Sequence, residues 1–370
     1  MKPTMRKPAL ILAVTGGLLA TVAHAEDKVS FHATQYAENQ QRINVVMGEV
    51  SIDKDFGTDY TVRLDLGHDA ISGATPMWEP KPGFANEFVE GQQNVANEKR
   101  NSVAGTLIAR DTARNEYTVG ASWSSEPDFL STGVSAQAQL WHDDAHNRSY
   151  TVGVGLLANT AIATPFTNKR EDRSSTVLNV QAGINQVLNP TSTVEGSVYV
   201  GQDKGYLSNH YLKIVRTDAF GLHYLADEVR PDQRNSGGLA ARWIKSWKPG
   251  VVSNLWYRYY TDDWGIVGHT VEVKAHWDVA PRWRLSPVLR MHQQSAASFY
   301  RGYGDAVNTF AATGLGVNDA RLGAFTANTT ALNVEYQSSS EWTFNTNLSD
   351  YRQDNGFSAR WLVAGFTYKY

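Results

Sequence analysis

Seven charged residues stand at alternate positions within stretches whose intervening residues are apolar or aromatic. They are Arg63, Asp65, Arg242, Arg258, Glu272, Lys274 and Arg290. On an extended strand, side chains two residues apart point to the same face, so these charges would lie on the polar faces of their strands. Cations and carboxylates facing a watery lumen create a transverse field that orients polar solutes. The chemistry that these residues predict is therefore electrostatic selection of a solute.

The four basic residues from Arg242 to Arg290 recur every sixteen residues. We expect them on four consecutive strands, where they would form a basic stripe on one wall. The equal spacing follows partly from regular hairpin length and is not a motif. The alternative is a set of ordinary interior ion pairs, with Arg258 and Glu272 pairing across one hairpin. The sequence leaves both interpretations open.

Strands with a two-residue repeat must position these charges. In residues 60–67, for example, apolar residues alternate with Thr61, Arg63 and Asp65. The same repeat predicts about sixteen strands, near residues 29–36, 43–52, 60–66, 103–109, 117–123, 134–140, 150–156, 178–184, 194–200, 239–243, 255–259, 271–277, 285–291, 332–336, 342–348 and 362–370. An even number of such strands is typical of a transmembrane, antiparallel, up-and-down β-barrel. We therefore expect an all-β fold.

The expected connections alternate between short polar turns and longer segments. Four of the longer segments span residues 68–101, 158–173, 203–235 and 294–327. If the short turns face the periplasm, both termini are periplasmic and the long segments are external. A soluble sandwich or propeller also has many short strands. Aromatic residues at the strand ends and the lack of a visible internal repeat argue against it.

Composition and the two ends of the chain predict the compartment. Residues 1–25 resemble a cleavable secretory signal, which leaves an expected barrel over residues 26–370. The chain has no cysteine and a net charge of −3, so we expect neither disulfides nor nucleic-acid binding. The mean hydropathy of −0.39 is compatible with a barrel, which needs only alternate residues to be apolar. No stretch is apolar enough for a spanning helix.

The last nine residues, 362–370, alternate and finish on an aromatic side chain, Tyr370. This ending is typical of bacterial outer-membrane barrels, and it predicts that location. The expected contacts are outer-membrane lipid and lipopolysaccharide, and the barrel-assembly machinery, which would read Tyr370. A homo-oligomer or a periplasmic partner is also compatible with the sequence.

Other chemistry finds little support in the sequence. The histidines form neither an HExxH motif nor a tight cluster, and no cofactor is expected. Glu126, Asp128, Asp262 and Asp263 fall at expected outer turns, where they could bind a divalent cation or simply stabilise turns. We expect no neighbouring Ser–His pair, and there is no G-x-S-x-G motif. The protein is therefore expected not to be an enzyme.

Several strings resemble an uncharacterised family of bacterial outer-membrane proteins, the domain-of-unknown-function family 3570. They are DAISGAT (69–75), SSEPDFLS (124–131), GYLSNHY (205–211), RPDQR (230–234), YRYYTDDWGIVGHT (257–270), PVLRMHQQSAASFY (287–300) and DARL (319–322). The resemblance covers nearly the whole mature chain and implies an outer-membrane location. It implies no reaction, substrate or site.

The leading hypothesis is a porin-like channel for small polar solutes, because barrels of about sixteen strands leave an aqueous path. A second hypothesis is a closed barrel that acts as a surface scaffold, or as a partner-binding component of an export or maturation system. A third is an outer-membrane enzyme acting on lipid or glycan. A lumen filled with side chains would favour the scaffold, and an open lumen would favour transport.

Overall fold

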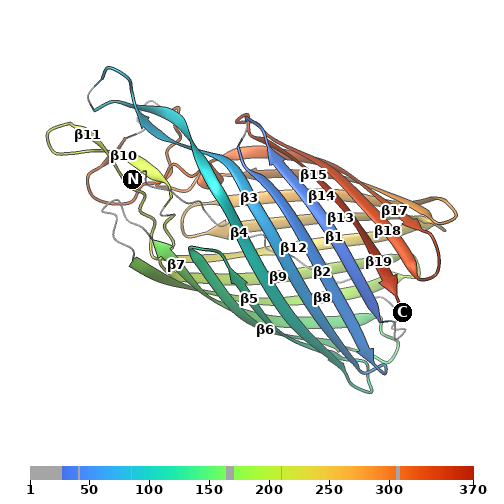
Figure 1. Ribbon diagram of the computed structural model, residues 1–370. Helices are drawn as coiled ribbons and strands as arrows, with labels where there is room; N and C mark the ends of the chain where they lie inside the picture. Colours follow the sequence, from blue (N-terminus) through green and yellow to red (C-terminus); the bar gives the residue numbers. More distant parts are fainter. Residues whose placement is uncertain (1–26, 41, 85, 164–170, 210, 306–308) are drawn as a thin grey trace.

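The computed structural model describes residues 27–40, 42–84, 86–163, 171–209, 211–305 and 309–370; the expected signal segment lies outside them. In this part of the chain, sixteen antiparallel strands close into one barrel (Figure 1). The prediction of the fold class and of the strand number is thereby confirmed. No helix among the described residues is long and apolar enough to cross a membrane.

Each barrel strand pairs with its neighbours along the chain, and β1 closes the ring on the last strand. The barrel strands are β1 (Lys28–Glu38), β2 (Asn44–Phe56), β3 (Tyr60–Pro80), β4 (Phe88–Arg110), β5 (Glu116–Ser125), β6 (Phe129–Trp141), β7 (Arg148–Ala163), β8 (Glu171–Asn189), β9 (Ser192–Gly205), β12 (Gln233–Lys248), β13 (Val251–Asp262), β14 (Val267–Ala280), β15 (Trp283–Gln294), β17 (Phe325–Gln337), β18 (Trp342–Gln353) and β19 (Ser358–Lys369).

The two-residue repeat of the sequence builds the two faces of the wall. On β3, Tyr60, Val62 and Leu64 are exposed on the outer surface, whereas Arg63 and Asp65 alternate with them and face the lumen. Because successive side chains of a strand point to opposite faces, one repeat suffices to give an apolar exterior and a polar interior. The barrel wall therefore needs no conventional hydrophobic core.

One end of the barrel, which we call the turn end, has only short connections. They span residues 57–59, 111–115, 142–147, 190–191, 249–250, 281–282 and 338–341. Gly250 has a φ of 76° in its two-residue turn, a conformation that glycine adopts without strain. The backbone N–H of Tyr370 donates to the carbonyl oxygen of Asp27 at 3.0 Å. Both ends of the described barrel therefore lie at the turn end.

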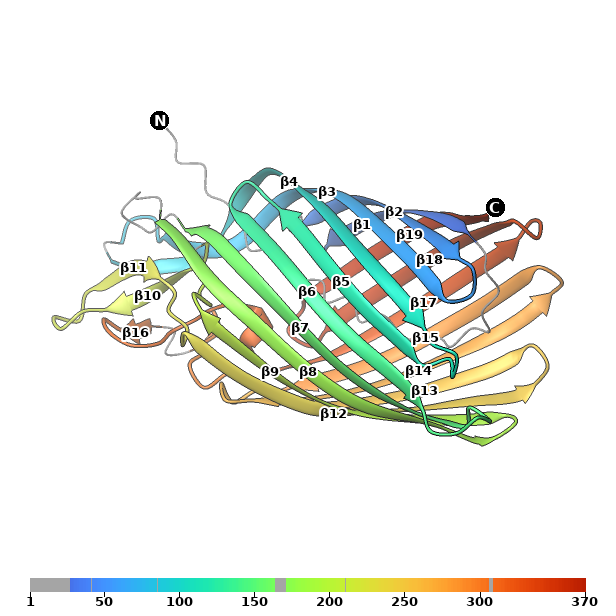
Figure 2. The same ribbon diagram turned by 90° about the horizontal axis from the view of Figure 1, so that it is seen from below.

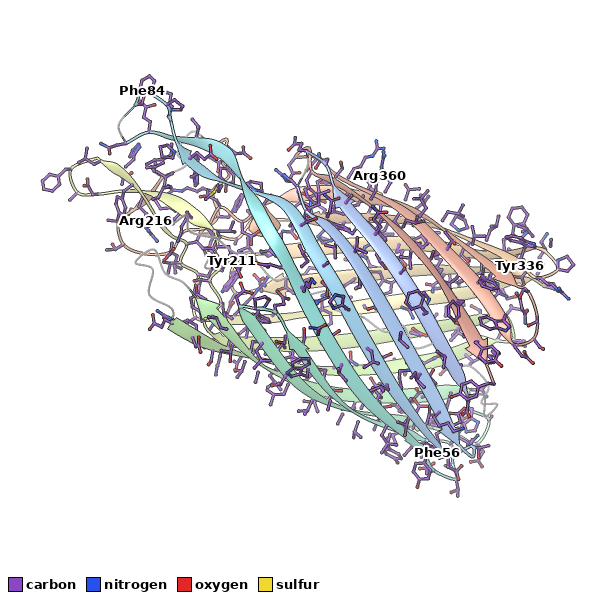
Figure 3. The ribbon with its side chains drawn as sticks, viewed as in Figure 1. Phe56, Phe84, Tyr211, Arg216, Tyr336 and Arg360 are labelled. Atoms are coloured by element: carbon purple, nitrogen blue, oxygen red, sulfur yellow. The ribbon has the colours of Figure 1, made fainter. Side chains whose placement is uncertain are left out.

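Aromatic side chains surround the outside of the turn end, and we call them the aromatic belt. The belt consists of Tyr60, Tyr117, Tyr150, Trp247, Trp277, Trp283, Tyr336, Trp342, Phe344, Phe366, Tyr368 and Tyr370. Ring centroids lie 4.6 Å apart both in the Trp283–Tyr336 pair and in the Trp342–Tyr368 pair. Figure 3 labels Tyr336 at this end. Such girdles mark a membrane interface in transmembrane barrels.

The opposite end, the loop end, carries most of the irregular structure. Strands β3 and β4 stay paired as far as Pro80 and Phe88, although β2 leaves β3 at Ser72 and β5 leaves β4 at Asn101. The pair therefore leaves the barrel as a two-stranded ribbon (Figure 1). Most of the segment expected as a connection over 68–101 is strand, because backbone pairing continues where the apolar alternation has stopped.

The two longest connections at the loop end fold together into a cap. Residues 206–232 supply β10 (Lys213–Thr217) and β11 (His223–Asp227), and residues 295–324 supply β16 (Thr309–Ala311) and the short 3₁₀ helix η1 (Ala320–Leu322). Strand β10 pairs with β11 on one side and with β16 on the other. Figure 2 shows this small sheet beyond the end of the barrel.

The cap has the hydrophobic core that the barrel wall does not need. Four of its residues belong to the cap, Ala297, Phe299, Val317 and Leu322, and two to the adjoining β13–β14 connection, Trp264 and Ile266. The rings of Trp264 and Phe299 meet edge to face at 5.2 Å. Trp78, from the β3–β4 ribbon, is 2% exposed, and its ring contacts that of Tyr303 at a tilt, with centroids 4.7 Å apart. Its indole N–H donates to Asn318 at 2.9 Å. Ribbon and cap are therefore packed as one folded unit at the loop end.

Candidate functional site

A cavity of about 730 Å³ lies between the cap and the lumen-facing side of the wall, and we call it the vestibule. The wall contributes residues of β6 to β9 and of β12 to β15, including Arg234, Arg258, Tyr260, Thr270 and His292. The cap contributes residues from its two long connections, which are Tyr206, Leu207, Ser208, Asn209, Tyr211, Arg230, Asp319, Arg321 and Leu322. Figure 3 labels Tyr211 at the loop end. The volume suits a small solute.

The wall presents two arginines to the vestibule: Arg234, which is paired with Asp262, and Arg258. Arg258 is held differently. Its Nε donates to the phenolic oxygen of Tyr199 at 2.8 Å. The guanidinium carbon lies 5.0 Å from the ring centroid of Tyr199 and 5.7 Å from that of Tyr260. No ion pair links Arg258 to a carboxylate among the described residues, although Thr270, its cross-strand partner, lies on the same strand as Glu272. The alternative pairing of Arg258 with Glu272 is therefore absent from the structure.

The cap faces the vestibule with a buried ion-pair network. Arg230 donates to Glu228 at 2.6 Å and to Asp319 at 2.8 Å, and Arg321 donates to Asp319 at 2.6 Å. Burial raises the pKa of Glu228 to about 7. Burial opposes ionisation of Asp319 as well, but the guanidiniums of Arg321 and Arg230 outweigh it and hold the pKa of Asp319 below its usual range. The network therefore holds this side of the vestibule rigid. Its two arginines already have carboxylate partners.

On the turn-end side of the vestibule, four charged side chains and one tryptophan form a row across five neighbouring strands. Glu195, Arg242, Trp256, Glu272 and Arg290 are successive cross-strand partners on β9, β12, β13, β14 and β15, and we call them the charged row. Arg242 donates to Glu195 at 3.1 Å, and the guanidinium of Arg290 lies 5.8 Å from the ring centroid of Trp256. Carboxylates and cations thus alternate along one wall.

The other predicted site residues lie outside this row. Arg258 lies one inward position nearer the loop end, and Lys274 one inward position nearer the turn end. Arg63 is close to the turn end, where it pairs with Asp53 at 2.5 Å, and Asp53 also accepts from Lys28 at 3.0 Å. The four basic residues are therefore lumenal but not level with one another.

Arg63 and Asp65 stand on the wall opposite the charged row. In the ring of strands, β3 is eight steps from β13 in either direction. Asp65 accepts a hydrogen bond from Ser51 on β2 and forms no ion pair among the residues that the structure describes. The order of the strands therefore places Asp65 across the lumen from the basic residues, as expected.

The acidic residues expected at outer turns fall into two groups. Asp262 accepts from Arg234 at 2.5 Å and from the backbone N–H groups of Trp264 and Ile266, which is turn chemistry. Glu126 and Asp128 instead meet Glu98 of β4, with one carboxylate oxygen from each within 4.8 Å of the others. A cation at Glu126 and Asp128 stays a prediction, and Glu98 is a possible third ligand that the sequence did not reveal.

The expectation that no Ser–His pair occurs is wrong. His276 Nδ1 lies 2.9 Å from Ser286 Oγ, and both side chains face the lumen. They face each other on β14 and β15, within the register that pairs Lys274 with Val288 and Trp277 with Leu285. Among the described residues no carboxylate forms a hydrogen bond with the His276 ring. The pair thus lacks the orienting third group that an activated nucleophile needs.

Comparison with known proteins gives a family and a fold. The family described as "Protein of unknown function (DUF3570)" matches residues 9–168 and 159–369. No curated protein matches the chain in sequence. A bacterial polysaccharide outer membrane secretin is similar in structure, with a TM-score of 0.52 and 7% identity over 94% of this chain and 100% of that one. This likeness shows the fold of an outer-membrane β-barrel.

Two further barrels are more distant. A BenF-like porin from Pseudomonas fluorescens Pf-5 has a TM-score of 0.45 and 8% identity, over 93% of this chain and 98% of the porin. A mutant of the ferric enterobactin receptor from Pseudomonas aeruginosa has a TM-score of 0.42 and 11% identity over 90% of this chain. The present chain spans 55% of the length of that receptor.

Proposed function

The chain belongs to the DUF3570 family of proteins of unknown function, and from that premise we propose that it is an outer-membrane channel for small polar solutes. In this proposal the turn end and both chain ends face the periplasm, and the cap faces the outside. Lipid and lipopolysaccharide surround the apolar exterior. The aromatic belt supports this placement, since amphipathic rings settle at membrane interfaces.

The observation that carries the proposal is the charged row inside a closed barrel of sixteen strands. Charges buried in a solid interior are costly unless each is paired. Glu272 and Lys274 form no ion pair among the described residues, so water in the lumen is their natural solvent. Sixteen strands make a cylinder wide enough to hold such water.

The vestibule would be the entrance of this channel. The other arginines that line the vestibule, Arg230, Arg234 and Arg321, are already bound to carboxylates. Arg258 is instead held by a phenol and two aromatic rings. Its guanidinium can therefore exchange partners with a passing solute at little cost. Solutes carrying a carboxylate or a phosphate make the best match, because both are bidentate acceptors for arginine.

Single-channel recording in planar bilayers tests the proposal. We expect the purified mature protein to produce discrete steps of ionic current that scale with salt concentration. A folded preparation, verified by its heat-modifiable migration on a gel, that inserts and produces no steps would overturn the channel.

The cap favours a second candidate function, a surface scaffold. A hydrophobic core holds the cap on the rim of the barrel. Phe84 and Phe220 expose apolar rings at the tips of the ribbon and of the β10–β11 hairpin (Figure 3 labels Phe84). Exposed apolar groups on a rigid projection suit a protein partner. Crosslinking in cells followed by purification separates the two functions, because a channel should recover only itself and lipopolysaccharide.

A further inference from the structure

Two arginines project from the outside of the barrel on its last two strands. Arg352 of β18 and Arg360 of β19 share the parity of Leu348 and Leu362, which are exposed on the outer surface. Their side chains are 67% and 72% exposed, and Figure 3 shows Arg360 pointing away from the wall. These positions face the surroundings of the barrel, not its lumen.

One carboxylate holds the two guanidiniums side by side. Asp350 accepts from Nε of Arg352 and from Nε of Arg360, both at 2.6 Å. The bonds use only the Nε atoms, so the terminal Nη groups of both arginines have no partner among the described residues. The flanking residues on the neighbouring strands are uncharged: Ala37 is the cross-strand neighbour of Arg360, and Ser358 and Asn328 are those of Arg352. The cluster therefore has a net positive charge and open space in front of it.

The height of this cluster on the barrel identifies its surroundings. From Arg360 toward the turn end, the outward side chains of β19 are Leu362, Ala364, Phe366 and Tyr368, and the last two belong to the aromatic belt. The eight residue-to-residue steps from Arg360 to Tyr368 span about 27 Å of strand, or about 20 Å along the barrel axis at a tilt near 40°. The apolar band of outer-membrane barrels is about 25 Å tall and is bounded by aromatic girdles, so Arg360 lies within about 5 Å of the far edge of the band, a gap that its long side chain can span.

The arginines therefore stand at the opposite edge of the band from the aromatic belt, at the level where lipid headgroups begin. An arginine facing hydrocarbon is strongly disfavoured, but at the interface the penalty nearly vanishes. Neighbouring guanidiniums with free Nη groups match the oxygens of a phosphate, which they bind by paired, charge-assisted hydrogen bonds. In the proposed orientation this edge lies in the outer leaflet.

We propose that Arg352 and Arg360, held together by Asp350, form a binding site for a phosphate group of lipid A, the membrane anchor of lipopolysaccharide. The inference rests on the proposed outer-membrane orientation and is independent of conduction. The site occupies the outer surface where the connections of β18–β19 and β1–β2 are short, so the cap does not cover it.

Native mass spectrometry of the mature protein in detergent micelles tests this site. Diphosphoryl lipid A is titrated against the wild type and against the double variant R352Q/R360Q. We expect about tenfold weaker binding in the variant, because charge-assisted hydrogen bonds to phosphate are lost. Fully dephosphorylated lipid A should bind both proteins equally weakly.

A matched control is R114Q, which removes an arginine from a short connection at the turn end. It should bind lipid A as the wild type does. Equal affinity of the wild type and R352Q/R360Q for diphosphoryl lipid A, with both proteins folded by heat-modifiable gel migration, would overturn the site. Current steps recorded from the same preparations report on the channel separately, so either claim can fail alone.

Discussion

At the scale of single residues, the position of the Arg258 side chain depends on Tyr199, and Tyr199 in turn needs the space that Gly238 leaves free. A Cβ atom at Gly238 would clash with the carbonyl oxygen of Tyr259 and with the phenol of Tyr199. Without it, the Tyr199 side chain lies across β12, donates to Tyr259 at 3.1 Å and accepts from Arg258. The position of the cation in the vestibule is therefore fixed by a side chain two strands away in the ring.

Glu126 gives a residue-scale prediction about pH. Burial and, secondly, the neighbouring Asp128 raise its pKa from 4.5 to about 7 in the folded protein. A carboxyl group with a raised pKa in the folded state does not reduce stability well below pH 4.5, where it is protonated in both the folded and the unfolded protein. The cost grows as the pH rises to 7 and stays constant above. Replacing Glu126 by Gln should therefore raise the free energy of unfolding at pH 8 by roughly 3 kcal/mol at most, and with it the melting temperature. At pH 4 both quantities should stay nearly unchanged.

Circular dichroism melts at the two pH values, in the presence of a chelator, measure this effect. The control is E341Q, which removes one carboxylate from an exposed turn at the turn end. An equal gain for E126Q at both pH values would show that the effect of the substitution does not come from ionisation of Glu126.

At the scale of elements, Trp78 joins the ribbon to the cap. Its ring is buried against Tyr303 and its N–H is bound to Asn318. Replacing a packed tryptophan by alanine costs about 3–5 kcal/mol. In W78A we expect this loss to be local, so amide hydrogen exchange should accelerate in residues 76–80 and 298–303 and stay unchanged in β5 to β8.

The control for this element is F84A, which alters an aromatic ring that is 53% exposed at the ribbon tip. Exchange in the cap should not change in F84A. If the cap of W78A exchanges as slowly as that of the wild type, the ribbon and the cap are held together by other contacts.

The barrel strands were predictable from the sequence because a wall with one apolar and one polar face requires a two-residue repeat. The same repeat assigned Arg258 and Arg290 to the lumen. The repeat could not show which of the four basic residues are cross-strand partners. In an antiparallel hairpin the residue numbers of partners have a constant sum, so an equal spacing of sixteen residues does not set the register. Arg242 therefore pairs with Trp256 and not with Arg258.

The vestibule was beyond prediction for a different reason. Its cap side depends on contacts between residues that are distant in sequence, such as Arg230 with Asp319 and Trp78 with Asn318. These segments show no two-residue repeat. Their strings RPDQR and DARL stood out only by resemblance to the family, which says nothing of the network that they form.

At the scale of the whole molecule, two ends with different structures give the barrel a direction. The turn end has short connections and the aromatic belt, and the loop end has the cap and the vestibule. Between them the charged row and Arg258 lie on one wall, with Asp65 on the opposite wall. A solute crossing the barrel in the proposed direction would meet the vestibule first and the charged row second.

The reversal potential in a potassium chloride gradient across a planar bilayer tests this account most directly. Neutralising three lumenal cations in R242Q/R258Q/R290Q leaves Glu195, Glu272 and Asp65 in the lumen, so the reversal potential should shift toward that of a cation-selective pore. The control K245Q removes a lysine from the outward face of β12 and should behave as the wild type does. An unchanged reversal potential in the triple variant would contradict the assignment of the charged row to the conducting path.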